Sequence, residues 1–253
     1  MKTKDNFPLD TLKIVYRWWF TRSQVRDIPL SRCITFTGFP FAKPGWHHLR
    51  LLCQELDANP NLSFDESILY RFHQQYHPKG MFELIRHKGN QVRFLPPLGI
   101  FPWGSLWGRR VVTRPNGNLE KDWYNSRFCG PTPREMIHWE FERMVKTYNS
   151  LKRYGYQPWR KGFIGGTFLN REDGEHRYII LQGNHRAAML AHLGVKSILT
   201  APVSGCSVQI DQQNVKEWEY VRTGRCSEND ALVYFRAFFE LTGYEQAERF
   251  GMV

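Results

Sequence analysis

The chain has 253 residues, of which 42% are hydrophobic and 23% are charged. These values are ordinary for a globular protein and exclude a chain that is disordered throughout. Its 35 Lys and Arg residues exceed its 24 Asp and Glu residues, and the net charge of +11 favours an anionic partner: a nucleotide, a sugar phosphate, nucleic acid or a membrane surface. Because the basic residues are scattered, a solvated basic surface is an alternative interpretation.

The five cysteines lie far apart, and the sequence contains no Cys-x-x-Cys pair. This spacing disfavours a zinc ribbon and a thioredoxin-type redox site, so we expect reduced thiols. No signal peptide or transmembrane segment is predicted near the N-terminus, where Asp5, Pro8 and Asp10 interrupt the apolar residues. We therefore expect a cytoplasmic protein.

Residues 1–95 form the first predicted region, which is mainly helical and rich in aromatic residues. Leucines recur on one face of residues 46–57. A second helix is predicted at 64–76, where Ser63 and Glu66 have the spacing of a capping box. Together they predict an antiparallel helical pair. The proline-rich stretch that follows favours an extended chain and a domain boundary.

Two histidine pairs in this region raise the question of a metal site. His47 and His48 are adjacent, and His73 and His77 have the i, i+4 spacing of one helical face. A zinc site needs at least a third ligand, and the sequence does not indicate which residue would supply it. We favour a surface or packing role for these histidines and leave the metal ligands open.

Residues 96–210 are predicted to contain an α/β core. Its clearest element is a helix that begins after Thr132, the expected cap, with Pro133 at its first position, and ends at Gly155. The next elements predicted are the two strands of a hairpin at 163–169 and 177–181, a buried helix at 187–193 and a short strand at 197–203.

The turn between the second hairpin strand and the buried helix consists of Gly183, Asn184, His185 and Arg186, called here the 183–186 turn. A strand that leads directly into a helix presents free N–H groups and the positive end of the helix dipole, which attract anions. Arg186 adds a fork of donors. In the alternative, purely structural interpretation, Gly183 makes the turn, Asn184 caps the helix, and the other two side chains face solvent.

Residues 211–253 form a predicted helical tail. Ser227 is expected to cap a helix that carries Ala231, Leu232 and Phe235 on its apolar face and stops near Gly243. The tail has no pattern typical of a DNA-recognition helix.

The segment Glu140–Leu199 resembles the ParB/sulfiredoxin superfamily: a helix, a hairpin, the 183–186 turn and an alanine-rich helix that ends in Leu-Gly occur in that order. Together with residues 128–131 and the tail residues from Trp218 to Phe235, it is also similar to ParB-like proteins associated with cell-surface polysaccharide genes. The resemblance implies a ParB/sulfiredoxin-like mixed sheet and helix core.

What the resemblance implies about function is nucleotide phosphate binding. Relatives bind CTP, use ATP to repair a sulfinic acid, or phosphorylate serine. By similarity, the 183–186 turn and the preceding Gln182 would contact the phosphates. This chain has Asn184 where sulfiredoxin has its cysteine nucleophile, which excludes thiol-based repair. It has Gln182 where the serine kinases have an aspartate, and glutamine cannot act as a general base.

Three hypotheses follow. The first is a nucleotide-dependent small-molecule kinase that uses ATP, ADP or CTP with Mg²⁺ and a hydroxyl-bearing acceptor, a sugar or an amino-acid-like molecule, with His185 and Glu140 as catalytic candidates. Glu142, Asp173 and Glu175 are further carboxylates that are better explained as surface charges. The second is a non-catalytic nucleotide-binding scaffold or regulator. The third, less favoured, is nucleic-acid binding or cleavage. The oligomeric state stays open.

Overall fold

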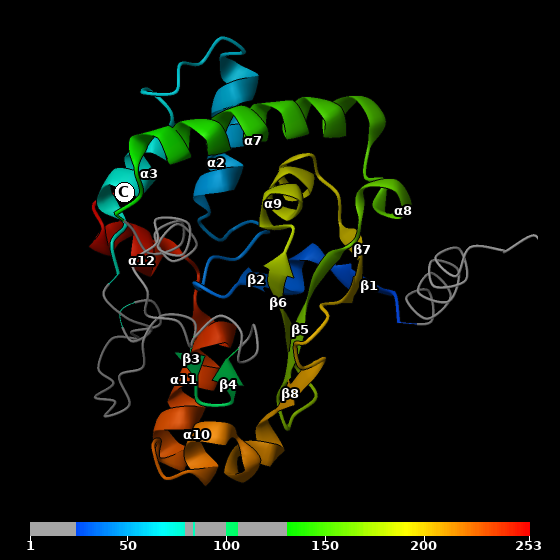
Figure 1. Ribbon diagram of the computed structural model, residues 1–253, viewed down its shortest axis with the longest axis vertical. Helices are drawn as coiled ribbons and strands as arrows, with labels where there is room; N and C mark the ends of the chain where they lie inside the picture. The colour runs from blue at the N-terminus through cyan, green and yellow to red at the C-terminus, as the bar shows by residue number, and fades with distance from the viewer. Residues whose placement is uncertain (1–23, 79–82, 84–99, 106–130) are drawn as a thin grey trace, which may run out of the picture.

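The computed structural model describes residues 24–78, 83, 100–105 and 131–253 (Figure 1). It is a mixed α/β structure built on one large sheet. The sheet contains β1 (Arg26–Pro29), β2 (Cys33–Thr35), β5 (Ile164–Asn170), β6 (His176–Gln182), β7 (Ser197–Pro202) and β8 (Gln209–Asp211). Their order is β1-β7-β5-β6-β2, and β8 pairs with β5. A separate small hairpin joins β3 (Ile100–Phe101) to β4 (Gly104–Ser105).

The sheet is mixed, because parallel and antiparallel pairs alternate across it. Neighbours β5 and β6 are antiparallel, as are β1 and β7. Strand β5 is parallel to β7 and β8, and β2 is parallel to β6. The pairing of β2 with β6 matters most for the site, because two parallel strands have their C-terminal ends at the same end of the sheet.

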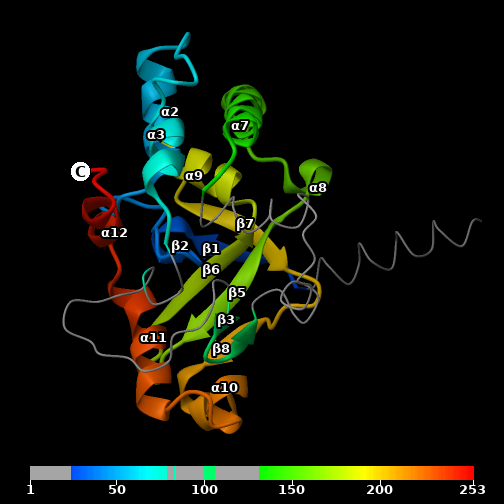
Figure 2. The ribbon, with the colours of Figure 1, turned by 60° about the vertical axis from the view of Figure 1, so that its left-hand side comes forward.

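Helices cover both faces of the sheet. The longer ones are α2 (His48–Ala58), α3 (Ile68–Gln75), α7 (Arg134–Tyr154), α9 (Asn184–His192) and α11 (Glu228–Glu240). Shorter ones are α8 (Pro158–Lys161), α10 (Glu219–Arg222), α12 (Tyr244–Arg249) and the 3₁₀ helices η1 (Leu30–Arg32) and η2 (Gln212–Glu217). Figure 2 shows α2, α3, α7 and α9 together on one side, with α10 and α11 away from them.

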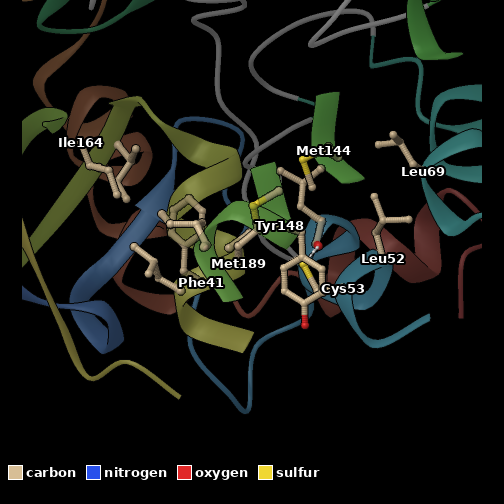
Figure 3. Packing of buried hydrophobic residues seen from close by; sticks show 14 of the residues in the cluster. Phe41, Leu52, Cys53, Leu69, Met144, Tyr148, Ile164 and Met189 are labelled. Carbon is tan, nitrogen blue, oxygen red and sulfur yellow. Dashed lines mark hydrogen bonds between the residues drawn. The ribbon is translucent and has the colours of Figure 1, made fainter. Parts of the chain in front are cut away.

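Alternate residues of β6 belong to two different cores, as the period-two geometry of a strand requires. Tyr178 and Ile180 pack with α2, α7 and α9, in the cluster drawn in Figure 3. Ile179 and Leu181 pack on the other face with the aromatic side of α11, including Phe235. A strand buried on both faces therefore carries the 183–186 turn, which holds that turn at a rigid position.

The predicted core elements are confirmed, with corrections to two of the caps. The helix expected after Thr132 is α7, which ends at Gly155, but the Thr132 hydroxyl contacts Nδ1 of His73 at 3.2 Å and makes no cap. Helix α3 begins later than predicted. Its cap is Ser67, which accepts from the Tyr70 N–H, and Ser63 donates to the Glu66 carboxylate instead.

The first region contributes more to the core than its predicted helical character implied. Strands β1 and β2 were not predicted, because they are only four and three residues long and too short to show a periodic pattern. They pair with β7 and β6, so a segment of the predicted N-terminal region completes the sheet. The expected boundary at residues 95–96 lies outside the described residues.

The cysteines Cys33, Cys53, Cys206 and Cys226 are free thiols, as expected. Cys129 is outside the described residues. Burial raises the pKa of the Cys53 thiol to about 12, so this side chain packs as a small apolar group. Within the described ranges, no helix combines the length and apolar character needed to cross a membrane.

Candidate functional site

A cavity of about 390 Å³ lies beside the 183–186 turn. Its walls come from the end of β2 and the loop after it, the start of α2, parts of α3 and α7, and the turn itself. The volume is within the range of about 300–1,000 Å³ that is usual for small-molecule sites.

Two helices begin at this cavity because two parallel strands end there. Strand β6 ends at Gln182, and α9 starts at Asn184. Strand β2 ends at Thr35, and a loop leads to α2, whose cap His47 lines the same cavity. The N–H groups of a first helical turn have no partner within the helix, and the dipole gives that end a partial positive charge. The cavity is therefore suited to an anion.

Gly183 makes the close approach between the start of α9 and β5 possible. It is the N-cap of α9 in the left-handed conformation, with φ 90°. A Cβ atom at this position would lie 2.9 Å from Cγ1 of Ile164 and 3.1 Å from Nη2 of Arg186. Both the backbone angle and the space favour glycine, which supports the predicted role of this residue in the turn.

Glu140 and His185, the two catalytic candidates, are in direct contact inside the cavity. Nε2 of His185 contacts the Glu140 carboxylate, and Nδ1 of His185 accepts a hydrogen bond of 2.8 Å from Nη2 of Arg143. Arg143 also pairs with Glu140 at 3.1 Å. Since arginine is always a donor, the arrangement is satisfied when His185 carries its proton on Nε2. The buried carboxylate thus has two partners, and the cavity does not present an uncompensated negative charge there.

His47 lies at the start of α2, where it is the N-terminal cap of the helix. Its side chain is 0% exposed, and its Nδ1 accepts a hydrogen bond of 3.2 Å from the Leu49 N–H. Burial, followed by the positive charge of Arg50, lowers the pKa of His47 to about 3. The ring is neutral at physiological pH, and its remaining proton is on Nε2.

His48 stacks on Phe72, with ring centroids 3.6 Å apart and an interplanar angle of 6°. Burial, with the neighbouring His47 as the next cause, holds the pKa of His48 well below its usual range. Phe72 in turn stacks on Tyr76. These rings supply the aromatic part of the cavity lining, which also includes the polar groups of α7 and α9.

Several buried polar atoms in the cavity have no hydrogen-bond partner within the described chain. They are Nε2 of His47, Nδ1 of His48, Nε of Arg143 and Oδ1 of Asn184. Buried polar groups are nearly always paired, with protein, water or ligand. Their concentration in one cavity therefore marks it as a binding site for a polar molecule.

Arg186, predicted to bind phosphate, is used differently from what its position in the turn suggests. Its guanidinium donates to the backbone carbonyls of Lys161, Gly162 and Phe163, at the end of α8 and before β5. Burial lowers its pKa. Arg186 lines the cavity, but its established contacts hold the segment that leads into β5.

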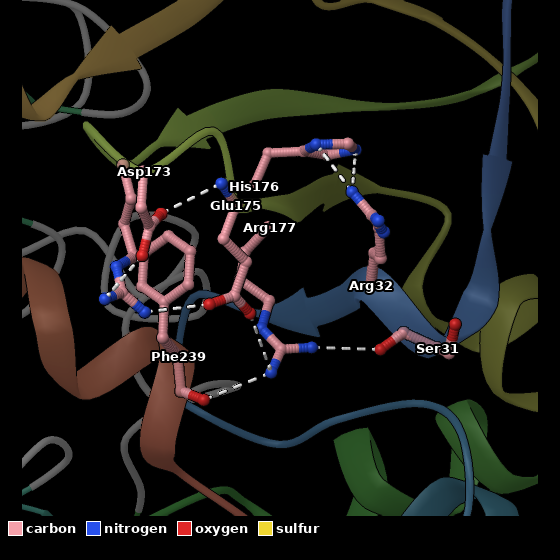
Figure 4. A network of polar contacts seen from close by, with 8 residues as sticks. Ser31, Arg32, Asp173, Glu175, His176, Arg177 and Phe239 are labelled. Atoms are coloured by element: carbon pink, nitrogen blue, oxygen red, sulfur yellow. Dashed lines mark hydrogen bonds and ion pairs between the residues drawn. The ribbon is translucent and has the colours of Figure 1, made fainter.

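The remaining predicted residues lie at the edge of the cavity or elsewhere. Gln182 is exposed and lines the cavity at the end of β6. Glu142 pairs with Lys146 on the outer face of α7. Asp173 and Glu175 pair with Arg171 in the hairpin turn, at the opposite end of β6 from the cavity (Figure 4). The interpretation of these three carboxylates as surface charges agrees with their contacts.

The sequence did not indicate Arg143 as part of the site. A signal was available, because Glu140, Arg143 and Thr147 recur at i, i+3 and i+7 and so share one face of a helix. All three line the cavity. The paired histidines at 47 and 48 were noted as metal candidates, but the described residues contain no group of three or more His, Cys, Asp or Glu side chains that could hold a metal ion.

Comparisons of the chain with protein-family models, curated proteins and solved structures found no match. The case for a function therefore rests on the cavity and its residues.

Proposed function

We propose that this protein binds a nucleotide or another small phosphorylated molecule in the cavity, with a phosphate group at the N-terminus of α9. The observation that carries the proposal is the group of unpaired buried polar atoms at a place where two helices begin. A phosphate has acceptor oxygens for the N–H groups of Asn184 and His185 and for Nε of Arg143.

The proposed fold family is ParB/sulfiredoxin-like. The support for it is the order α7, β5, β6, the 183–186 turn, α9 and β7, which is the order of elements that led to the resemblance. In this proposal the nucleotide is ATP, ADP or CTP. An accompanying Mg²⁺ would take most of its ligands from phosphate oxygens and water, because Glu140 is the one acidic residue among the described residues that line the cavity.

The geometry favours binding without turnover over phosphoryl transfer. A general base needs a free lone pair, and in His185 the Nδ1 lone pair accepts from Arg143 while Nε2 contacts Glu140. Phosphoryl transfer to a hydroxyl-bearing acceptor would require Arg143 to leave His185. A scaffold or regulatory protein that responds to a nucleotide is therefore our first choice, and a small-molecule kinase is the alternative.

Thermal unfolding with ligands tests the proposal directly. The panel consists of ATP, ADP, CTP, GTP, inorganic phosphate and sugar phosphates, each with and without Mg²⁺. A ligand at 100 times its Kd stabilises the folded protein by about 2.7 kcal/mol, which raises the midpoint by several degrees. If no member of the panel raises the midpoint of the unaltered protein, the proposal is wrong.

The variant Asn184→Asp tests whether the phosphate of the ligand binds at the N-terminus of α9. This substitution keeps the size of the side chain and suits a helix N-terminus, but it adds a negative charge where the phosphate would bind. We expect a loss of binding of at least about tenfold with little loss of stability. Asn61→Asp makes the same change at an exposed residue in the turn between α2 and α3, and it should bind like the unaltered protein.

A second candidate function, nucleic-acid binding, is favoured by the surface along α7 and α8. Tyr154 and Trp159 are 56% and 49% exposed. Tyr154 lines a groove together with Lys146 and Lys161, and this groove shares Arg186 with the cavity. Exposed aromatic rings beside cations are typical of surfaces that bind single strands.

The mobility of a single-stranded DNA oligonucleotide at increasing salt concentration tests this candidate. Binding should weaken steeply with salt, and the double substitution Tyr154→Ala and Trp159→Ala should weaken it further. A mobility shift that is the same in the double variant would exclude this surface.

A further inference from the structure

We infer that His47 is a ligand-contacting residue, which donates its Nε2–H to an anionic oxygen of the molecule whose phosphate lies at the N-terminus of α9. This inference rests on the proposed function and extends it to a residue of the N-terminal region. It also assigns the ligand to a chemical class: an anion with acceptor oxygens on more than one side, such as a diphosphate or a phosphate with an adjacent oxygen.

The first support is the way the chain orients the ring of His47. Its Nδ1 accepts the Leu49 N–H and so caps α2. A nitrogen that accepts a hydrogen bond carries no proton, so the proton of the neutral ring is on Nε2. The Nε2–H is therefore on the side of the ring away from the cap, in a residue that lines the cavity.

The second support is the burial of this donor. His47 is completely buried, yet its Nε2 has no hydrogen-bond partner in the part of the chain that the structure describes. Leaving a buried donor unpaired costs about 1–3 kcal/mol. A chain that required only a cap for α2 could have used Asp, whose carboxylate caps a helix and leaves no second donor to be satisfied.

The third support is the arrangement of donors around the cavity. Nε of Arg143 comes from α7, the first N–H groups come from α9, and His47 comes from the start of α2. These groups are donors, and Glu140, the one acidic side chain among the described residues that line the cavity, is already paired with Arg143 and His185. Donors from separate elements suit an anion that has several acceptor oxygens better than a cation or an apolar molecule.

Two substitutions of His47 test the roles of its two ring nitrogens separately. His47→Asn keeps an acceptor for the Leu49 N–H near the position of Nδ1 and removes the Nε2–H. His47→Gln reaches the position of Nε2 with an amide donor but is a poor helix cap. His138→Asn is the matched control, because His138 is exposed on α7 and does not line the cavity.

Titration calorimetry with ATP, ADP, CTP and inorganic pyrophosphate measures the effect. We expect His47→Asn to keep its thermal midpoint and to bind about tenfold or more weakly, as expected for the loss of a hydrogen bond to a charged group. His47→Gln should lose thermal stability and bind within about threefold of the unaltered protein. His138→Asn should not change the affinity.

The outcomes separate this inference from the proposed function. If the unaltered protein binds one of these anions and a folded His47→Asn binds it equally well, the inference is wrong and the proposed function stands. If folded His47→Gln loses binding as fully as His47→Asn, the ring and not its Nε2–H is required, which also overturns the inference. If the unaltered protein binds none of these anions or the phosphates of the thermal panel, both fall together.

Discussion

Nε2 of His185 contacts the carboxylate of Glu140, which joins the first turn of α9 to the middle of α7 inside the cavity. Glu140 is 5% exposed, and it also pairs with Arg143, which lies one helical turn along α7. This contact positions the turn that we propose as the phosphate site. A disturbance of the pair should therefore affect both stability and binding.

We expect Glu140→Gln to lower the free energy of unfolding by about 1–3 kcal/mol, because it removes the charge that pairs with two buried or half-buried partners. Glu142→Gln changes an exposed neighbour and should stay within about 0.5 kcal/mol. Urea denaturation at pH 7 measures both. Equal effects of the two substitutions would contradict a special role for the Glu140 contact.

Gly183→Ala should destabilise the protein more than Gly174→Ala. Both glycines have positive φ angles, 90° and 86°, so both substitutions cost about 1–2 kcal/mol in backbone strain. At Gly183 the new methyl group also meets Ile164 at 2.9 Å, whereas at Gly174 nothing lies within 4 Å. The comparison of the two thermal midpoints isolates the packing term. If Gly174→Ala lowers the midpoint as much, the close approach of α9 to β5 carries no extra free energy.

The buried histidines should make the protein less stable as the pH falls from about 6.5 toward 3. His47 has its pKa lowered to about 3 in the folded state, against about 6.5 in the unfolded chain. Between these values the unfolded state binds more protons, so the free energy of unfolding falls with decreasing pH, by up to about 1.4 kcal/mol per pH unit for one histidine. Urea denaturation from pH 7 to pH 4.5 should show a shallower slope for His47→Asn. A slope that does not change would mean that His47 is protonated in the folded state.

Asp57 connects α2 to α7 and α9, and its contribution to stability should change over a lower pH range than that of His47. Its carboxylate accepts from Lys152 at 2.8 Å, His192 at 2.7 Å and Tyr148 at 2.8 Å. The hydrogen bonds from Lys152 and His192 hold the pKa of Asp57 below its usual value. The stabilisation is present above the unfolded pKa of about 3.9 and is lost as the pH falls through the lower folded value.

Because the Asp57 contacts are partly exposed to water, we expect Asp57→Asn to cost only about 0.5–1 kcal/mol at pH 7. The difference from the unaltered protein should become smaller below about pH 4. Chemical denaturation at pH 7 and pH 3 measures it. A difference that grows at acid pH would show that the carboxylate does not act through its charge.

Arg186→Ala should lower the stability of the protein more clearly than its affinity for a ligand. The guanidinium holds three successive carbonyls in front of β5, and its loss removes three charge-assisted hydrogen bonds from this segment. We expect a loss of about 1–3 kcal/mol in the free energy of unfolding. Hydrogen exchange should increase at residues 161–165. If stability is unchanged and only ligand affinity falls, Arg186 is a direct phosphate ligand, as its place in the turn first suggested.

The predictable parts of the fold were those determined by local sequence. Helix α7 follows from one apolar stripe and a terminal glycine, and the hairpin of β5 and β6 follows from two apolar runs around a turn. Ser227 caps α11 as predicted, with its hydroxyl accepting the Asp230 N–H. Each of these features depends on residues within a few positions of one another, so the chain carries the signal locally.

The sequence by itself determined the 183–186 turn, because a glycine between an apolar strand and an apolar helix specifies a strand-to-helix junction and its free N–H groups. Only the tertiary structure decided what faces that junction. It brought His47 from α2 and Arg143 from α7 to the cavity, and it turned Arg186 toward the carbonyls of residues 161–163. The position of His47 follows from the pairing of β2 with β6, which joins residues more than 140 positions apart, and no local pattern encodes a contact of that range.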